Sequence, residues 1–178
     1  MRIGLLGGSF NPPHQGHIYI SLEARKRLKL DQIWWLVNKQ NPLKELKNSS
    51  FNQRLQQCQK ITKKQPKIVV KADEKHLKSN YSIDLIKKIS TKYKQHQFFW
   101  IIGADNMLNF HLWRQWQNII KLTPLIILNR NHSLTKAAKS KAFFYCQKIS
   151  KGSNKKCYML KNKQYHLSSS LIRKSSKR

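Results

Sequence analysis

The sequence predicts a doubly wound α/β fold, in which helices cover both faces of a parallel β-sheet. Short apolar runs alternate along the chain with segments whose apolar residues recur at helical spacing, which is typical of βαβ units. The length of 178 residues allows one compact domain. No linker rich in Pro, Gly or Ser divides the chain, so we expect one domain over residues 1–173 and a loose basic tail over residues 174–178.

Six apolar runs are the expected strands. They span residues 3–6, 33–37, 68–70, 98–102, 125–128 and 158–160. Apolar residues at helical spacing predict helices between the strands. These residues are Ile18, Leu22 and Leu28 in one helix, Phe51, Leu55, Cys58 and Ile61 in a second, and Ile83, Ile86, Ile89 and Tyr93 in a third. In such an open sheet ligands bind beyond the carboxyl ends of the strands, so we expect functional residues in the loops at that edge.

The charge of the chain is strongly positive. Lys and Arg total 36 against 7 Asp and Glu, which gives a net charge of +29 and favours anionic partners. The 28 Lys and 8 Arg are spread along the chain instead of forming one tract, so we interpret most of them as a solvated surface. The alternative is a continuous electrostatic footprint for a nucleic acid.

The cysteines and the apolar runs indicate a cytoplasmic protein with no membrane association. Cys58, Cys146 and Cys157 form no CxxC pair and are odd in number, which argues against a disulfide framework and against a zinc ribbon. The apolar stretch at the N-terminus is too short for a signal peptide. No uncharged apolar run reaches the ~18 residues that a membrane-spanning helix needs.

A glycine turn and two histidines follow the first expected strand. Gly7 and Gly8 let backbone N–H groups approach an anion closely, although neither a Walker A loop nor a GxGxxG motif is present. His14 and His17 project from the first turn of the next helix, where the helix dipole favours anions. No Cys, Asp or Glu lies nearby to complete a metal site. The pattern indicates phosphate binding; the alternative is that one His caps the helix while the other packs.

Two further segments offer polar groups at expected loop positions. Ser168, Ser169 and Ser170 precede an apolar pair and Arg173, which predicts a second helix N-terminus with hydroxyl, N–H and guanidinium donors. The alternative is a plain capping cluster on a C-terminal helix. Asp105 follows the apolar run at 98–102, where its carboxylate would lie at the carboxyl edge of the sheet or serve as a helix N-cap.

These segments resemble the signatures of the nucleotidylyltransferase superfamily. GGSFNPPHQGH at 7–17 resembles GxFxPxHxGH, and SSSLIR at 168–173 resembles SSTxIR. The middle of the chain resembles bacterial nicotinate-nucleotide adenylyltransferases, and the resemblance spans residues 1–173. It rests on NPLK at 41–44, YSID at 81–84, GAD at 103–105 and the pair Trp113 and Trp116. Class I aminoacyl-tRNA synthetases share an HxGH element but need far longer chains.

The chain departs from the family pattern at four positions. Asn11 stands where Asp is frequent, Leu85 where Thr is common, Ser170 in place of Thr, and Gln117 where an aromatic residue is common. We expect the changes at Asn11, Leu85 and Ser170 to remove no group that the reaction needs.

The resemblance implies a Rossmann-like enzyme that transfers the adenylyl group of ATP to nicotinate mononucleotide in NAD biosynthesis, releasing pyrophosphate and deamido-NAD. It implies Mg²⁺ carried by the ATP phosphates instead of by a protein metal site, and no specific nucleic-acid partner. The alternatives are another small adenylyltransferase, such as one acting on phosphopantetheine, and a basic nucleic-acid-binding module on the same fold. The Trp pair weighs against the first alternative, because a pantetheine arm has no ring to stack.

The resemblance also assigns residues to roles. His14, His17 and Arg173 are the expected catalytic residues. The expected ATP-binding residues are Gly7, Gly8, Ser9, Phe10, Gly103, Asp105, Ser168, Ser169, Ser170 and Arg173. The expected mononucleotide-binding residues are Lys44, Ser82, Trp116 and Gln117, with Trp116 stacked on the pyridine ring and Trp113 packed beneath it. Without the resemblance, Lys44 reads as one solvated lysine among many and the Trp pair as core.

The reaction itself needs no protein nucleophile. The phosphate of the mononucleotide attacks the α-phosphorus of ATP in line, and pyrophosphate leaves. Catalysis then depends on positioning two anions and neutralising the charge that develops between them. Imidazole N–H groups are rigid, directed donors, so His14 and His17 suit contacts to phosphate oxygens.

Overall fold

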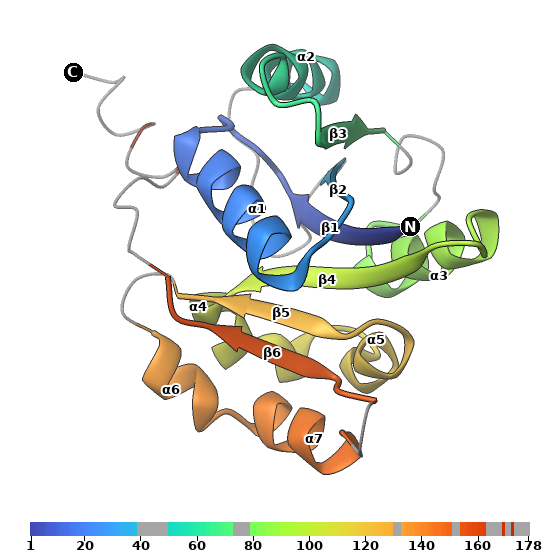
Figure 1. Cartoon of the computed structure of the whole chain (residues 1–178), viewed down its shortest axis with the longest axis vertical. Helices are drawn as coiled ribbons and strands as arrows, with labels where there is room; N and C mark the ends of the chain where they lie inside the picture. Colours follow the sequence, from blue (N-terminus) through green and yellow to red (C-terminus); the bar gives the residue numbers. More distant parts are fainter. Residues whose placement is uncertain are drawn as a thin grey trace.

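In the computed structural model, the described part of the chain forms a six-stranded parallel β-sheet with helices on both faces (Figure 1). The structure describes residues 1–38, 50–72, 79–129, 133–150, 154–162, 169 and 172. The strand order is β3-β2-β1-β4-β5-β6, and every neighbouring pair is parallel. This is the strand order of the Rossmann fold, so the predicted doubly wound α/β architecture is confirmed.

Each of the six predicted apolar runs forms a strand. The strands are β1 (Arg2–Gly8), β2 (Gln32–Val37), β3 (Ile68–Lys71), β4 (Gln97–Gly103), β5 (Leu125–Leu128) and β6 (Cys157–Leu160). The first strand runs two residues further toward its carboxyl end than predicted. Gly7 and Gly8 have no apolar side chain to mark them as strand, yet their backbones still pair with Leu36 and Val37.

The helices in the described residues lie between these strands. They are α1 (Gln15–Leu28), α2 (Phe51–Thr62), α3 (Ser82–Lys92), α4 (Ala104–Leu108), the 3₁₀ turn η2 (Phe110–Leu112), α5 (Trp116–Leu122), α6 (Leu134–Ala138) and α7 (Lys141–Ile149). The predictions for α1, α2 and α3 are confirmed. A capping box opens α2: Ser50 Oγ accepts from Gln53 N at 3.2 Å, and Gln53 Oε1 accepts from Ser50 N at 2.9 Å.

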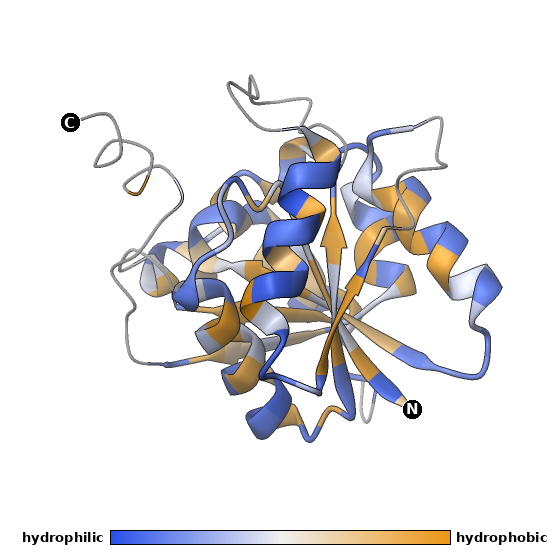
Figure 2. Cartoon of the chain, turned by 90° about the horizontal axis from the view of Figure 1, so that it is seen from above, coloured by the Kyte–Doolittle hydropathy of each residue, from blue (hydrophilic) through white to orange (hydrophobic). Residues whose placement is uncertain are grey.

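Side chains that alternate along the strands build two cores. Trp35 packs on the face that α1 and α2 cover, whereas its neighbours Trp34 and Leu36 pack on the face that α3 to α7 cover. In Figure 1, α1 lies in front of the strands and α4 behind them. Figure 2 shows the same layers from above, with apolar strands inside and hydrophilic outer faces on the helices. Both faces of the sheet are thus buried, which explains why the strands read as continuous apolar runs.

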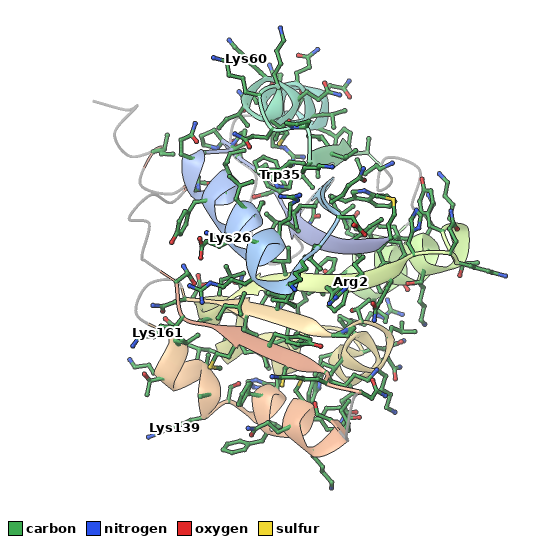
Figure 3. All side chains as sticks on the ribbon, viewed as in Figure 1. Arg2, Lys26, Trp35, Lys60, Lys139 and Lys161 are labelled. Atoms are coloured by element: carbon green, nitrogen blue, oxygen red, sulfur yellow. The ribbon has the colours of Figure 1, made fainter. Side chains whose placement is uncertain are left out.

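The positive charge is spread over separate elements. Lys26, Lys60, Lys139 and Lys161 are all exposed and extend from α1, α2, the end of α6 and the segment after β6, whereas Trp35 lies inside (Figure 3). Among the described helices, none is long and apolar enough to cross a membrane.

The three cysteines are buried and form no disulfide. A hydrogen bond joins the thiol of Cys146 in α7 to Cys157 in β6. That bond and burial raise the pKa of Cys146, and the same bond lowers the pKa of Cys157. No local sequence pattern predicts this contact, because the two residues belong to different elements.

Candidate active site

The site lies beside β1, where the order in which successive strands join the sheet reverses. From β1 the chain continues to β2 and β3 on one side, and it returns to β4 on the other side of β1. The loops that leave β1 and β4 therefore diverge, and ligands of open α/β sheets bind in the crevice that such loops leave at the carboxyl ends of the strands. The segment before α1 follows β1 and α4 follows β4, so both lie at this edge of the sheet.

Close packing fixes the backbone of the turn after β1. A Cβ added to Gly7 would lie 2.8 Å from the ring of Trp100, so a larger residue would force a shift here. Phe10 has φ of 46°, a left-handed conformation that bulky residues rarely adopt. The ring of Phe10 is 1% exposed and stacks on Trp35, with centroids 4.8 Å apart and an interplanar angle of 14°. Burial of the ring thus holds the strained turn in place.

His14 and His17 together cap the N-terminus of α1. Gly16 N donates to Nδ1 of His14 at 3.1 Å, and His14 N donates to Nδ1 of His17 at 3.2 Å. The two ring centroids lie 3.8 Å apart. Since Nδ1 accepts a hydrogen bond in both rings, the proton of each neutral imidazole is on Nε2. Both rings thus take part in the cap, whereas the alternative had one His capping and the other packing, and the cap sets the tautomer in which Nε2 is a donor.

A buried chain of hydrogen bonds holds this helix end against β2. Trp35 Nε1 donates to Ser21 Oγ at 2.9 Å, and Ser21 Oγ donates to the carbonyl of His17 at 2.7 Å. The edge of the His17 ring also meets the Trp35 ring, with centroids 5.8 Å apart. The position of His17 is thus fixed by groups from both α1 and β2.

The C-terminal signature meets the N-terminal one. Ser169 Oγ donates to the carbonyl of Pro12 at 2.9 Å, although the residues are 157 positions apart. The structure thereby brings Ser169 to the segment that precedes α1. The other residues expected here, Ser168, Ser170 and Arg173, lie outside the described residues.

Asp105 lies at the start of the short helix that follows β4. Gly103 is the N-cap of α4, and no side chain caps this helix, so the interpretation of Asp105 as an N-cap is wrong. Asp105 lies in the first turn instead, half-buried, where the helix dipole favours a carboxylate. Since β4 is the neighbour of β1, Asp105 and the histidines belong to the same edge of the sheet.

The residues expected to bind the mononucleotide come from two neighbouring helices. Ser82 is the first residue of α3, and Trp116 is the first residue of α5. Two contacts join these helix starts: the Arg114 guanidinium lies 4.7 Å from the Tyr81 ring centroid, and Lys87 Nζ donates to Gln115 Oε1 at 3.4 Å.

The two tryptophans are half-buried, and both pack against the core. Trp113 packs on Phe110 with centroids 4.9 Å apart, and Trp116 meets the ring of Tyr145 edge-on at 5.1 Å. The structure therefore gives the pair a packing role, and both residues remain partly exposed.

The remaining residues of the resemblance fall in different environments. Gln117 is exposed. Lys44 lies outside the described residues. Leu85, at a position where Thr is common in the family, is buried in the core with Ile86, so the substitution adds apolar packing.

Arg54 is a residue of this region that the sequence analysis missed. The predicted apolar face of α2 was Phe51, Leu55, Cys58 and Ile61, but the buried stripe is Arg54, Cys58 and Thr62. Arg54 is 0% exposed, and its Nη1 donates to the carbonyls of Ser9 at 2.6 Å and Asn38 at 2.7 Å. Arg is rarely buried, so apolar periodicity passed over it.

Comparisons with known proteins identify the family. A model of the cytidylyltransferase-like family matches residues 5–175. The chain is 38% identical over 174 residues to the probable nicotinate-nucleotide adenylyltransferase of Pelagibacter ubique, a match that covers 97% of this chain and 92% of the relative. The chain belongs to the nicotinate-nucleotide adenylyltransferase family. A second member, from Ruegeria sp., is 39% identical over 142 residues, which cover 80% of this chain and 75% of that one.

A solved structure of the same class has the same fold. The nicotinic acid mononucleotide adenylyltransferase of Plasmodium falciparum, complexed with NaAD, superposes with a TM-score of 0.78 at 21% identity. The match covers 97% of this chain and 82% of that one. The resemblance found in the sequence to nicotinate-nucleotide adenylyltransferases is thus confirmed, and so is the Rossmann-like fold that it implied.

Proposed function

We propose that this enzyme transfers the adenylyl group of ATP to nicotinate mononucleotide, forming deamido-NAD and pyrophosphate in NAD biosynthesis. One observation carries the proposal: a relative that bears this name matches along 97% of the chain, including both signature segments. The hydrogen bond from Ser169 to Pro12 supports it, because it joins the two signatures at the carboxyl edge of the sheet.

The histidines would act as donors to the α-phosphate. Each Nδ1 accepts a backbone hydrogen bond, so each Nε2 carries the proton that can be donated to a phosphate oxygen. His17 would contact the α-phosphate and His14 would assist. Negative charge develops as the attacking oxygen approaches the α-phosphorus. The positive end of the α1 dipole would help the two rings to stabilise this charge.

The glycine turn and the C-terminal serines would hold the rest of ATP. Backbone N–H groups of the turn after β1 would donate to the triphosphate from one side. The turn comprises Gly7, Gly8, Ser9 and Phe10. Ser168, Ser169 and Ser170 with Arg173 would bind the β- and γ-phosphates from the other side. The contact of Ser169 with Pro12 supports this division.

The donor set fits a magnesium ion that arrives with ATP. The described residues include no group of three or more His, Cys, Asp or Glu that would hold a metal ion. Asp105 supplies one carboxylate at the edge of the sheet, beside Gly103. Mg²⁺ is commonly held by one or two carboxylates together with substrate phosphates and waters. Bound in that way, Mg²⁺ would neutralise charge on the leaving pyrophosphate, and Asp105 would order it or accept from the ribose hydroxyls.

The acceptor site would lie at the starts of α3 and α5. Trp116 would offer its accessible surface to the pyridine ring, and backbone N–H groups near Ser82 and Gln117 would receive the carboxylate. Lys44 would bind the phosphate of the mononucleotide. The contact between Tyr81 and Arg114 supports this grouping, because it holds the two helix starts together. We also propose a cytoplasmic location, which the buried, unbridged cysteines support.

An acceptor panel tests the proposed function. Purified protein with ATP and Mg²⁺ is offered nicotinate mononucleotide, nicotinamide mononucleotide and phosphopantetheine in turn, and pyrophosphate release is measured. We expect the highest kcat/KM with nicotinate mononucleotide. Faster release with phosphopantetheine, or none with any acceptor, would contradict the proposal.

A further inference from the structure

The position of Arg54 is unusual for a cation. Its side chain belongs to the buried stripe of α2, between the helix and the sheet face on which Trp35 packs. Burying a guanidinium is costly unless hydrogen bonds replace its hydration. Here one nitrogen, Nη1, donates to two backbone carbonyls, those of Ser9 and Asn38.

These carbonyls lie where β1 and β2 separate. The pairing of the two strands continues through Asn38, whose N–H donates to the carbonyl of Gly8 at 3.0 Å. Beyond this bond, Arg54 Nη1 contacts the segments that follow both strands, 2.6 Å from the Ser9 oxygen and 2.7 Å from the Asn38 oxygen. The guanidinium thus holds the diverging ends of the strands at a fixed separation.

The bond to Ser9 also orients the next donor. The carbonyl of Ser9 and the N–H of Phe10 belong to one planar peptide group and point in opposite directions. Because Arg54 takes the carbonyl, the N–H of Phe10 points away from Arg54. Phe10 itself is held in a left-handed conformation, so this peptide would turn if its anchors were removed.

We propose that Arg54 is a positioning residue for adenylyl transfer, which orients the Ser9–Phe10 peptide so that its N–H donates to a phosphate of ATP. The inference rests on the proposed function, since it assumes that the turn after β1 binds ATP. Arg54 acts through the backbone and touches no reacting atom. Its positive charge, buried behind the turn, adds to the attraction for the triphosphate.

Three variants separate positioning from packing. Arg54→Lys keeps the charge but loses the planar fork, Arg54→Met removes the charge at similar length, and Cys58→Ala is the control one turn further along the same buried stripe. Each is measured for melting temperature, for the Kd of a non-hydrolysable ATP analogue, and for kcat and KM with both substrates. Misplacing a positioning group by about 1 Å can cost 10²-fold.

We expect Arg54→Lys to weaken the ATP analogue and to lower kcat/KM for ATP by about 10- to 100-fold, with the KM for nicotinate mononucleotide within about twofold. We expect Arg54→Met to have at least this effect. Cys58→Ala should melt at a lower temperature and keep normal kinetics while it is folded. If folded Arg54→Lys binds and uses ATP as the wild type does, the proposal is overturned.

A measurement on the wild type covers the case in which the Arg54 variants do not fold. The backbone amide resonance of Phe10 should shift on titration with the ATP analogue. An unmoved Phe10 resonance, at concentrations where other resonances of the turn shift, would overturn the proposal. Analogue binding needs no acceptor, so a wrong assignment of the mononucleotide would leave these results unaffected.

Discussion

Single residues at the helix start combine two roles. Helix caps are usually Ser, Thr, Asp or Asn, yet the N-terminus of α1 is capped by two imidazoles. An imidazole has a second nitrogen on the far side of the ring, so one ring can satisfy the helix and still present a donor elsewhere. A Ser cap would keep its O–H donor, but on the same atom that accepts from the helix end, whereas the imidazole places its donor on the far side of the ring. One His at each position can therefore cap the helix and present a donor away from it.

Removing one imidazole should reduce turnover far more than it reduces stability. We expect His17→Ala to lower kcat by roughly 10²-fold or more, the scale for losing one donor to a developing charge. The lost cap should cost about 1 kcal/mol of unfolding free energy. The matched variant His17→Gln restores the capping-box acceptor, so its melting temperature should recover. Near-normal turnover in a folded His17→Ala variant would rule out the phosphate role.

Trp116 should affect the two substrates unequally. Stacking of a ring on an aromatic side chain contributes about 1 to 3 kcal/mol, so Trp116→Ala should raise the KM for the mononucleotide and leave the KM for ATP almost unchanged. Its contact with Tyr145 also predicts a lower melting temperature. Trp113→Ala is the control, with a stability loss and a smaller kinetic effect. An unchanged acceptor KM in a destabilised Trp116→Ala variant would leave only the packing role.

At the scale of elements, the sequence predicts buried strands well and buried polar residues poorly. All six strands were found because both faces of the sheet are covered, which makes each strand apolar throughout. The short helices α4 to α6 have too few residues to show a periodic pattern. Of the buried residues of α2 only Cys58 was predicted, because Arg54 and Thr62 carry polar groups that the fold satisfies by hydrogen bonds.

The same contrast holds for the candidate site. Parts of the site that come from one continuous segment, such as the turn after β1, were recognisable from the local sequence. The contact of Ser169 with Pro12 joins distant parts of the chain, and no local pattern contains it. The role of Arg54 depends on the backbone carbonyls of Ser9 and Asn38. Every residue type has a backbone carbonyl, so the sequence does not reveal these contacts.

The buried thiol of α2 predicts a loss of stability in alkali. Burial raises the pKa of Cys58 to about 12 from 9.0, and the nearby Arg54 partly opposes this shift. Between these values the unfolded chain loses a proton that the folded chain keeps, so the stability that this thiol contributes below pH 9 is lost as the pH rises toward 12. By pH 9.5 the loss should be about 1 kcal/mol.

The Cys58→Ala variant isolates this contribution. Its unfolding free energy should be lower at neutral pH because of the cavity, but it should fall less steeply between pH 8.5 and pH 9.5 than that of the wild type. Denaturant unfolding at several pH values measures both slopes. Equal slopes in the two proteins would contradict the assignment to Cys58.

At the scale of the whole molecule, the net charge of +29 affects every encounter with an anion. Its lysines are dispersed over the helices, as the exposed positions of Lys26, Lys60 and Lys139 illustrate. We therefore expect nucleic acid to bind weakly at low salt, without sequence preference, and to dissociate between ~50 and ~200 mM salt. Titration of two unrelated oligonucleotides measures this. Tight, sequence-selective binding at the higher salt would favour the nucleic-acid-binding alternative.

The hydrogen bond from Ser169 to Pro12 has a consequence for biosynthesis. Pro12 leaves the ribosome early, whereas Ser169 is translated 157 residues later, on the order of 10 s at typical elongation rates. A nascent chain that ends at Asn162 already contains all six strands of the sheet, but not the serines of the second signature. The sequence of the sheet is therefore complete before the second signature is translated. A chain truncated after Asn162 and released from the ribosome should keep the sheet but fail to retain ATP, because it lacks the serines of the second signature.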